Sequence, residues 1–156
     1  MKHLKGFNEG LSNNEEFFEL KDFCETTLAY LIDMGFTLRF RCRYDYTTRY
    51  SKTSKSLSEI SELVICMNDD YDLSNSLRQS VNWNSIDNII IPFIQLLSRR
   101  YRLRDFDGPG YVLPNSIIKL ESGSYGSDCY TLENLVKGID LPKTVHTITI
   151  KIEDKL

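Results

Sequence analysis

The spacing of apolar residues in the first part of the chain predicts a long amphipathic helix. Between Asn14 and Met34, apolar side chains recur every three or four residues, which places them on one helical face. Ser12 and Glu15 have the spacing of a capping box at the N-terminus, and Gly35 marks the C-terminus. The predicted inward face consists of Phe17, Leu20, Cys24, Leu28 and Leu31.

After Gly35 the apolar residues alternate with charged ones, which predicts an extended strand with two different faces. The apolar face comprises Leu38, Phe40, Cys42 and Tyr44, and the charged face comprises Arg39, Arg41, Arg43 and Asp45. A polar connection from Thr47 to Ser56 leads to a second predicted strand, Ile60 to Met67.

A second helix–strand unit follows in the same order. A helix is predicted to start near Asn84 or Ser85 and to kink at Pro92, because proline lacks the backbone N–H that a helical hydrogen bond needs. The alternative is that the regular helix begins only near Ile91. Its inward face comprises Ile86, Ile89, Ile90, Phe93, Leu96 and Leu97. The strand Arg100 to Phe106 follows directly and ends at a turn rich in glycine, aspartate and proline.

Shorter elements are predicted for the remainder of the chain. Turn residues separate several short apolar runs, and an alternating run of isoleucines indicates a final strand. The predicted elements are strands at 111–113, 117–120 and 145–153, a helix at 131–137 that ends at Gly138, and a flexible connection at 123–127.

Two helix–strand–strand units predict an α+β fold. We expect a two-layer sandwich in which two main helices cover one face of an antiparallel sheet, as in a circularly permuted ferredoxin-like arrangement. The other sheet face would be open. At 156 residues the chain is predicted to form a single domain, 1–156, with residues 1–12 as an N-terminal arm.

Composition narrows the classes of partner. The net charge of −3 gives no overall attraction for nucleic acid or anionic membrane, so any such attraction requires a local basic patch. The cysteines lack the paired spacing of a metal site and indicate reduced thiols in a cytoplasmic protein. Because no apolar run is long enough to span a bilayer, we expect a soluble protein with no membrane partner.

The two arginine-rich strands are the predicted binding site. Alternate side chains on a strand lie about 7 Å apart, close to the spacing of phosphates on a nucleic-acid strand, and guanidinium groups bind phosphate well. Tyrosines near the first strand could stack on bases. The predicted ligand-binding residues are Arg39, Arg41, Arg43, Tyr46, Arg49, Lys52, Arg100, Arg102 and Arg104.

A structural role for the same arginines is the main alternative. The permuted arrangement places the two arginine strands at opposite sheet edges, where charge prevents edge-to-edge aggregation. Acidic residues such as Glu62, Glu153 or Asp105 could then pair with the arginines across strands. The two edges of a four-stranded sheet stand about 14 Å apart, so a shared ligand would have to be extended.

Catalytic and metal-binding patterns are not evident in the sequence, and we predict no catalytic residue, no metal ligand and no cofactor. The acidic runs lack the spacing of a calcium loop. A nucleophile and base formed by Cys66 or Cys129 with His146 remains the one catalytic alternative.

Three segments carry a resemblance to proteins of large tailed bacteriophages. The segments 1–10, 23–36 and 83–97, the last with Ile91, Pro92 and Phe93 at its centre, resemble uncharacterised small proteins of such phages. The first segment is also similar to the targeting peptide of phage head proteins, which would be cleaved after Glu9. The resemblance implies a phage origin and no particular activity.

These observations favour a non-enzymatic phage accessory protein in the cytoplasm of an infected bacterium. It would act on a host or defence component by binding either a phosphate-bearing ligand, such as a nucleotide or nucleic acid, or a host or phage protein. A packaged or structural virion protein and an enzyme of unknown class are the alternatives.

Overall fold

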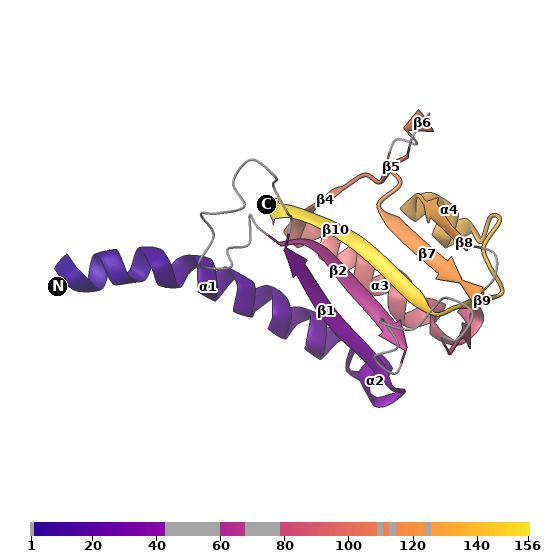
Figure 1. Cartoon of the computed structure of the whole chain (residues 1–156), viewed down its shortest axis with the longest axis horizontal. Coiled ribbons are helices and arrows are strands. Elements are labelled where there is room, and N and C mark those ends of the chain that lie inside the picture. Colours follow the sequence, from indigo (N-terminus) through magenta and orange to yellow (C-terminus); the bar gives the residue numbers. More distant parts are fainter. Residues whose placement is uncertain (1, 43–59, 68–78, 109–110, 113–114, 124–125) are drawn as a thin grey trace.

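Helices cover one face of a main antiparallel sheet (Figure 1). The structure is a computed structural model that describes residues 2–42, 60–67, 79–108, 111–112, 115–123 and 126–156. The helix layer includes α1 (Lys2–Thr27) and α3 (Trp83–Arg100). Buried residues of both helices and of the sheet form one apolar core.

The first helix is longer than its apolar pattern predicts and is divided near its end. α1 starts well before Asn14, so this predicted boundary is wrong, and its first turns project beyond the sheet (Figure 1). A second short helix, α2 (Ala29–Asp33), follows Leu28. Gly35 then adopts a φ of 106°, a conformation that residues with a Cβ rarely take, and the chain turns into the sheet.

The main sheet has its longest strand, β10, at the centre. Its strands are β1 (Phe36–Cys42), β2 (Ile60–Met67), β10 (Thr147–Lys155), β7 (Ile118–Ser122), β8 (Gly126–Tyr130) and β4 (Tyr101–Arg104). They are ordered β1-β2-β10-β7-β8, and β4 also pairs with β10. Because Lys151 of β10 pairs with Glu62 on one side and with Arg104 on the other, β4 lies across β10 from β2.

The second main helix, α3, packs an apolar stripe against the sheet. Ile86, Ile90 and Phe93 are completely buried at the spacing that the sequence predicts. The helix runs through Pro92. Pro92 and Asn88 are both exposed, so water can reach the Asn88 carbonyl that proline leaves without its helical donor.

Short elements complete the second half of the chain. They are α4 (Leu132–Lys137), the hairpin of β5 (Asp107–Gly108) with β6 (Tyr111–Val112), and the pair of β3 (Val81–Asn82) with β9 (Thr144–Val145). The helix α4 is the one predicted at 131–137. The predicted flexible connection at 123–127 is wrong at its end, because Gly126 begins β8.

The α+β class and the antiparallel main sheet are confirmed, and the arrangement is compatible with a two-layer sandwich. The predicted strand at Ile60–Met67 is β2. Arg100 is the last residue of α3 and not the first residue of a strand, so its predicted placement is wrong. An arginine at a helix–strand junction suits either element, so the observed junction differs from the predicted one by a single residue.

Candidate binding face

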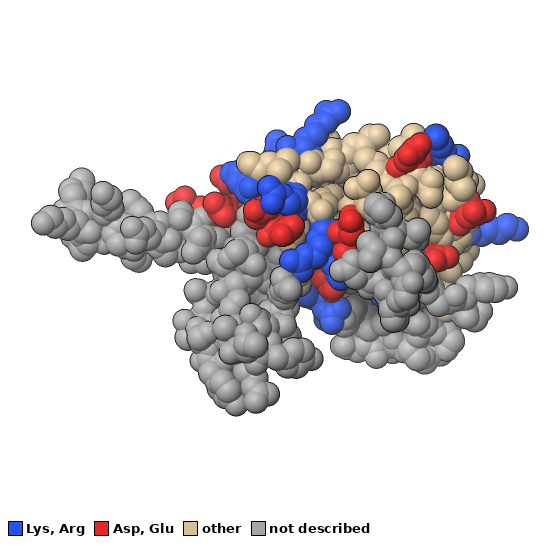
Figure 2. Space-filling model, turned by 90° about the horizontal axis from the view of Figure 1, so that it is seen from above, with Lys and Arg blue, Asp and Glu red and all other residues tan. Residues whose placement is uncertain are grey.

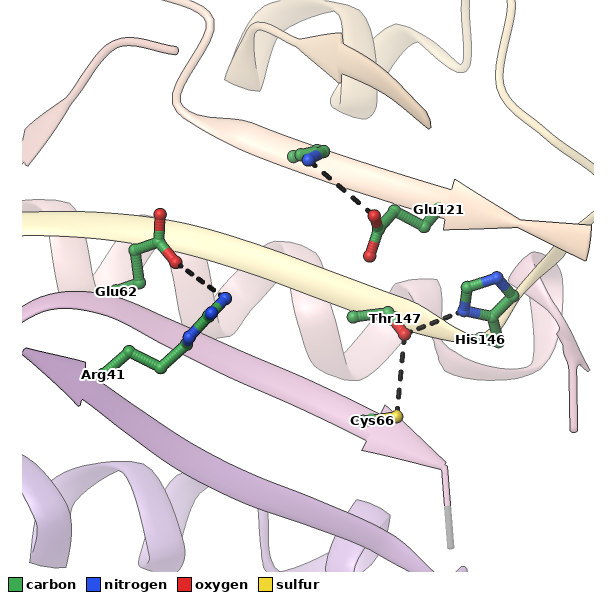
Figure 3. A network of polar contacts seen from close by, with 7 residues as sticks. Arg41, Glu62, Cys66, Glu121, His146 and Thr147 are labelled. Carbon is green, nitrogen blue, oxygen red and sulfur yellow. Dashed lines mark hydrogen bonds and ion pairs between the residues drawn. The ribbon is translucent and has the colours of Figure 1, made fainter. Parts of the chain in front are cut away.

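The first arginine strand, β1, carries Arg39 and Arg41 on the face that points away from the helices, termed here the outer face. Leu38 and Phe40 pack against the core from the opposite face, so the alternation of the strand fixes this orientation. The pairing register sets Arg41 opposite Glu62, and Arg41 Nη1 lies 3.4 Å from Glu62 Oε2 (Figure 3). The Arg41 side chain is 50% exposed, and an ion pair of this kind contributes about 0–1 kcal/mol.

The second arginine strand, β4, also presents its arginines on the outer face, because its alternate residues pack into the core. A register shift in β10 between Ile152 and Asp154 sets two consecutive acidic residues against this strand. Arg102 Nε lies 3.6 Å from Asp154 Oδ1, and Arg104 Nη2 lies 3.9 Å from Glu153 Oε1. Both contacts are long and solvent-exposed, so they hold the arginines only weakly.

A single row of charged residues connects the two arginine strands. Arg41 pairs in register with Glu62, Glu62 with Lys151, and Lys151 with Arg104. This cross-sheet row runs over β1, β2, β10 and β4 and spans about 14 Å. Positive and negative side chains alternate along most of it, so the row is a mixed surface with both signs of charge.

Further charged and aromatic groups lie beside this row. Lys151 Nζ is 4.8 Å from the centre of the Phe106 ring, and Lys119 Nζ is 3.7 Å from Glu121 Oε1. Cys129 pairs in register with Lys119. Burial raises the pKa of the Cys129 thiol, and the positive charge of Lys119 offsets part of this increase. Figure 2 shows basic and acidic side chains interspersed over the described surface that it displays.

Arg100 lies in a different environment from the other predicted binding residues. It lines a groove of about 620 Å³ between α1 and the ends of α3, β4 and β10, and its guanidinium carbon is 4.5 Å from the centre of the Phe23 ring. In the same groove Lys155 Nζ donates to Glu19 Oε2 at 2.8 Å, which raises the pKa of Lys155. Glu19, Phe23, Arg100 and Lys155 are among the residues that line this groove.

The structure therefore brings together part of the predicted site. Arg39, Arg41, Arg102 and Arg104 share the outer face, and Arg100 lies in the groove. The remaining predicted residues, Arg43, Tyr46, Arg49 and Lys52, lie outside the described residues.

Sequence reasoning missed several groups on the outer face. Lys151 is absent from the predicted binding residues. It lies between Ile150 and Ile152, and because both isoleucines face the core, the alternation of the strand places Lys151 on the outer face. Asp154 became a partner of Arg102 only through the register shift in β10, which no local pattern marks. Lys119 could have been found from the alternation between Ile118 and Leu120.

Two residues of the catalytic alternative, Cys66 and His146, take part in a buried polar link between β2 and β10, whereas Cys129 lies on β8 and has no part in this link. His146 Nδ1 is 2.8 Å from Thr147 Oγ1, whose hydroxyl donates to Cys66 Sγ at 3.6 Å (Figure 3). Cys66, His146 and Thr147 are all at most 1% exposed, so the link is closed to solvent.

Comparisons with protein-family models, with curated proteins and with solved structures find no match to this chain. Among the described residues, no three His, Cys, Asp or Glu side chains are grouped as a metal site would require. The helices in the described part of the chain are too short or too polar to cross a membrane.

Proposed function

We propose that this chain is a non-enzymatic binding protein that recognises a protein partner through the exposed end of the outer face, where the arginines of β1 and β4 lie. The observation that carries the proposal is the cross-sheet row of Arg41, Glu62, Lys151 and Arg104. A surface that carries both signs of charge is complementary to a protein surface with the opposite charges at matching positions. A polyanion would meet the carboxylate of Glu62 within the same row.

Weak pairing among the surface charges supports this assignment. The Arg41, Arg102 and Arg104 ion pairs are 3.4–3.9 Å long and solvent-exposed. Rearranging such pairs costs about 1 kcal/mol or less each, so a partner can replace them with better contacts. The closed Cys66–Thr147–His146 link supports a role without chemistry at these groups.

Single-stranded nucleic acid or a nucleotide is the second candidate ligand. It is favoured by Arg102, Arg104 and Lys151 together with the ring of Phe106, because basic residues beside aromatic rings are typical of such sites. The carboxylates of Glu153 and Asp154 next to these arginines favour the protein partner instead.

We further propose that the fold is a duplication of one helix–strand–strand unit, in the permuted ferredoxin-like order. The pairing order β1-β2-β10-β4 supports it, since each helix would lead to an outer strand and then to an inner one. Residues 105–146 would then be an insertion in the second unit. The free thiols of Cys24, Cys66 and Cys129 support an origin in a reducing cytoplasm, which we take to be that of an infected bacterium.

Affinity capture from bacterial lysate, followed by reconstitution with the purified partner, tests the binding proposal. We expect a protein retained by the wild type and by Lys137→Ala on α4, but lost with the double variant Arg102→Ala/Arg104→Ala. Binding of the purified partner should weaken between about 50 and about 200 mM salt, because it depends on surface charge.

The same variants distinguish the two candidates. Labelled single-stranded oligonucleotides and cyclic dinucleotides that bind at about 50 mM salt, and lose affinity in Arg41→Ala and Arg102→Ala, would replace the protein partner by a phosphate-bearing ligand. If no partner or nucleotide distinguishes the wild type from the double variant, the outer face is not a binding surface.

A further inference from the structure

The strand β1 forms one boundary of the main sheet. It stands first in the order β1-β2-β10-β7-β8, and among the described strands it pairs only with β2. A strand in this position has backbone N–H and C=O groups along its second side that can accept another strand. β1 is also the longer of the two arginine strands, with seven residues against four in β4.

The inner side chains of β1 have apolar surface left to bury. Phe36 is 3% exposed, whereas Leu38 and Phe40 are half-buried although they pack against the core. The ring of Phe40 meets the ring of Phe17 edge to face at 5.7 Å, so α1 supports β1 from the inner side. An additional strand beside β1 would cover these two half-buried side chains further.

The charges beside β1 specify what such a strand should carry. Across the sheet, Arg41 pairs in register with Glu62, which pairs with Lys151. On a strand added beside β1, the residue that pairs with Arg41 would continue this alternation of charge if it were acidic. Arg39 lies two residues from Arg41 on the same face, so a second acidic residue would lie at the matching alternate position, about 7 Å away.

We propose that β1 binds an extended segment of a partner protein as an additional β-strand. The segment has acidic residues at alternate positions beside Arg39 and Arg41, and apolar residues between them beside Leu38 and Phe40. A peptide fits this edge better than a nucleic acid because its backbone supplies the N–H and C=O groups that pair with a strand. This inference rests on the proposed protein-binding function and names its binding mode.

A set of seven-residue peptides tests the proposal, since seven is the length of β1. The first alternates Glu with Val, the second has the same side chains with alternate backbone amides N-methylated, and the third alternates Lys with Val. We expect only the first to bind, measured by fluorescence anisotropy. N-methylation removes the backbone donors and leaves the side-chain charges, so it separates strand addition from charge attraction.

Protein variants locate the binding. The double variant Arg39→Glu/Arg41→Glu should lose at least about tenfold in affinity for the Glu–Val peptide and gain affinity for the Lys–Val peptide. Arg99→Glu, an exposed charge reversal on α3, is the matched control and should leave both affinities unchanged. Amide hydrogen exchange should slow within Phe36–Cys42 when the Glu–Val peptide is present.

Two results would overturn the inference. Equal binding of the N-methylated peptide would mean that charge alone attracts the segment, in which case the proposed function stands without strand addition. Failure of the Glu–Val peptide to bind at about 1 mM would remove β1 as a peptide site. The capture experiment, which alters Arg102 and Arg104 on the other strand, decides the proposed function separately.

Discussion

Burial of Cys24 in the core makes the stability of the protein depend on pH. The thiol is completely buried, and desolvation, with a smaller contribution from Glu25, raises its pKa from 9.0 to about 12. Below about pH 9 the thiol is protonated in both the folded and the unfolded chain. Above that pH the unfolded chain ionises first, so we expect the free energy of unfolding to fall by about 1.4 kcal/mol per pH unit from this group.

Urea unfolding between about pH 8 and about pH 11 measures this effect. The variant Cys24→Ala lacks the thiol, and the fall in its stability over this range should be smaller than in the wild type. Burial also raises the pKa values of Tyr101 and Tyr130. Tyr130 contributes equally in the two proteins, whereas the pKa of Tyr101 is raised in part by the Cys24 charge, so its contribution to the fall is also smaller in Cys24→Ala. Equal pH dependence in the two proteins would contradict the prediction.

Only some of the acidic partners of the outer-face arginines could be predicted from the sequence. Glu62 and Glu153 were expected to pair with arginines across strands, and both do. Asp105 was expected as well and forms none of the ion pairs recorded for the described residues. Asp154 takes part instead, because the register shift in β10 offers β4 one more acidic residue than strict alternation allows.

The short helix α4 owes its boundaries to two capping residues. Thr131 Oγ1 accepts from the Asn134 N–H at 3.0 Å, and Gly138 ends the helix with a φ of 70°. We expect Thr131→Ala to lower the free energy of unfolding by about 1 kcal/mol, because the Asn134 N–H loses its acceptor. Gly138→Ala should cost about 1 kcal/mol through backbone conformation, since nothing lies within 4 Å of an added Cβ.

Thermal or urea unfolding of the two variants tests the capping prediction, and Thr131→Ser is the matched control because it keeps the hydroxyl acceptor. Leu135 of the same helix is 1% exposed, so loss of α4 must expose part of the core. Wild-type stability in both Thr131→Ala and Gly138→Ala would show that these caps do not contribute.

Elements with a strong local signal were predicted well, and those defined by distant pairing were not. α4 follows from its cap residues and β2 from its apolar run, and both were predicted close to their observed bounds. β8 was missed because Gly126, Ser127 and Asp128 have low strand propensity and are extended through pairing with β7. The end of α3 was misplaced by one residue, because an arginine at a helix–strand junction suits either element.

At the scale of the whole molecule, the fold class follows from the order of elements, and the strand order does not. Two helices, each followed by two strands, predict an α+β protein, and this class is confirmed. The sequence does not predict the central position of β10. This last strand of the chain lies between β2 on one side and β7 with β4 on the other. Such pairing depends on contacts between residues far apart in the chain.

The projecting part of α1 leads to a prediction about the whole fold. Among the residues of α1 whose side chains are described, contact with the apolar core begins at Phe17, and the first fully buried residue is Leu20. The N-terminal turns of α1 extend beyond the sheet (Figure 1). We therefore expect removal of residues 2–12 to leave the thermal midpoint within about 2 °C of the wild type, while the helical circular dichroism signal per molecule decreases.

A matched substitution within the packed part of the same helix provides the comparison. Leu20→Ala removes a completely buried side chain next to the sheet and should lower the free energy of unfolding by about 2–5 kcal/mol, with a clear fall in the thermal midpoint. If the truncated chain instead lost stability on the scale of Leu20→Ala, the projecting turns would have to pack against the domain or against a second copy. Sedimentation of the full-length chain would separate these two cases, because only self-association makes the sedimenting mass increase with protein concentration.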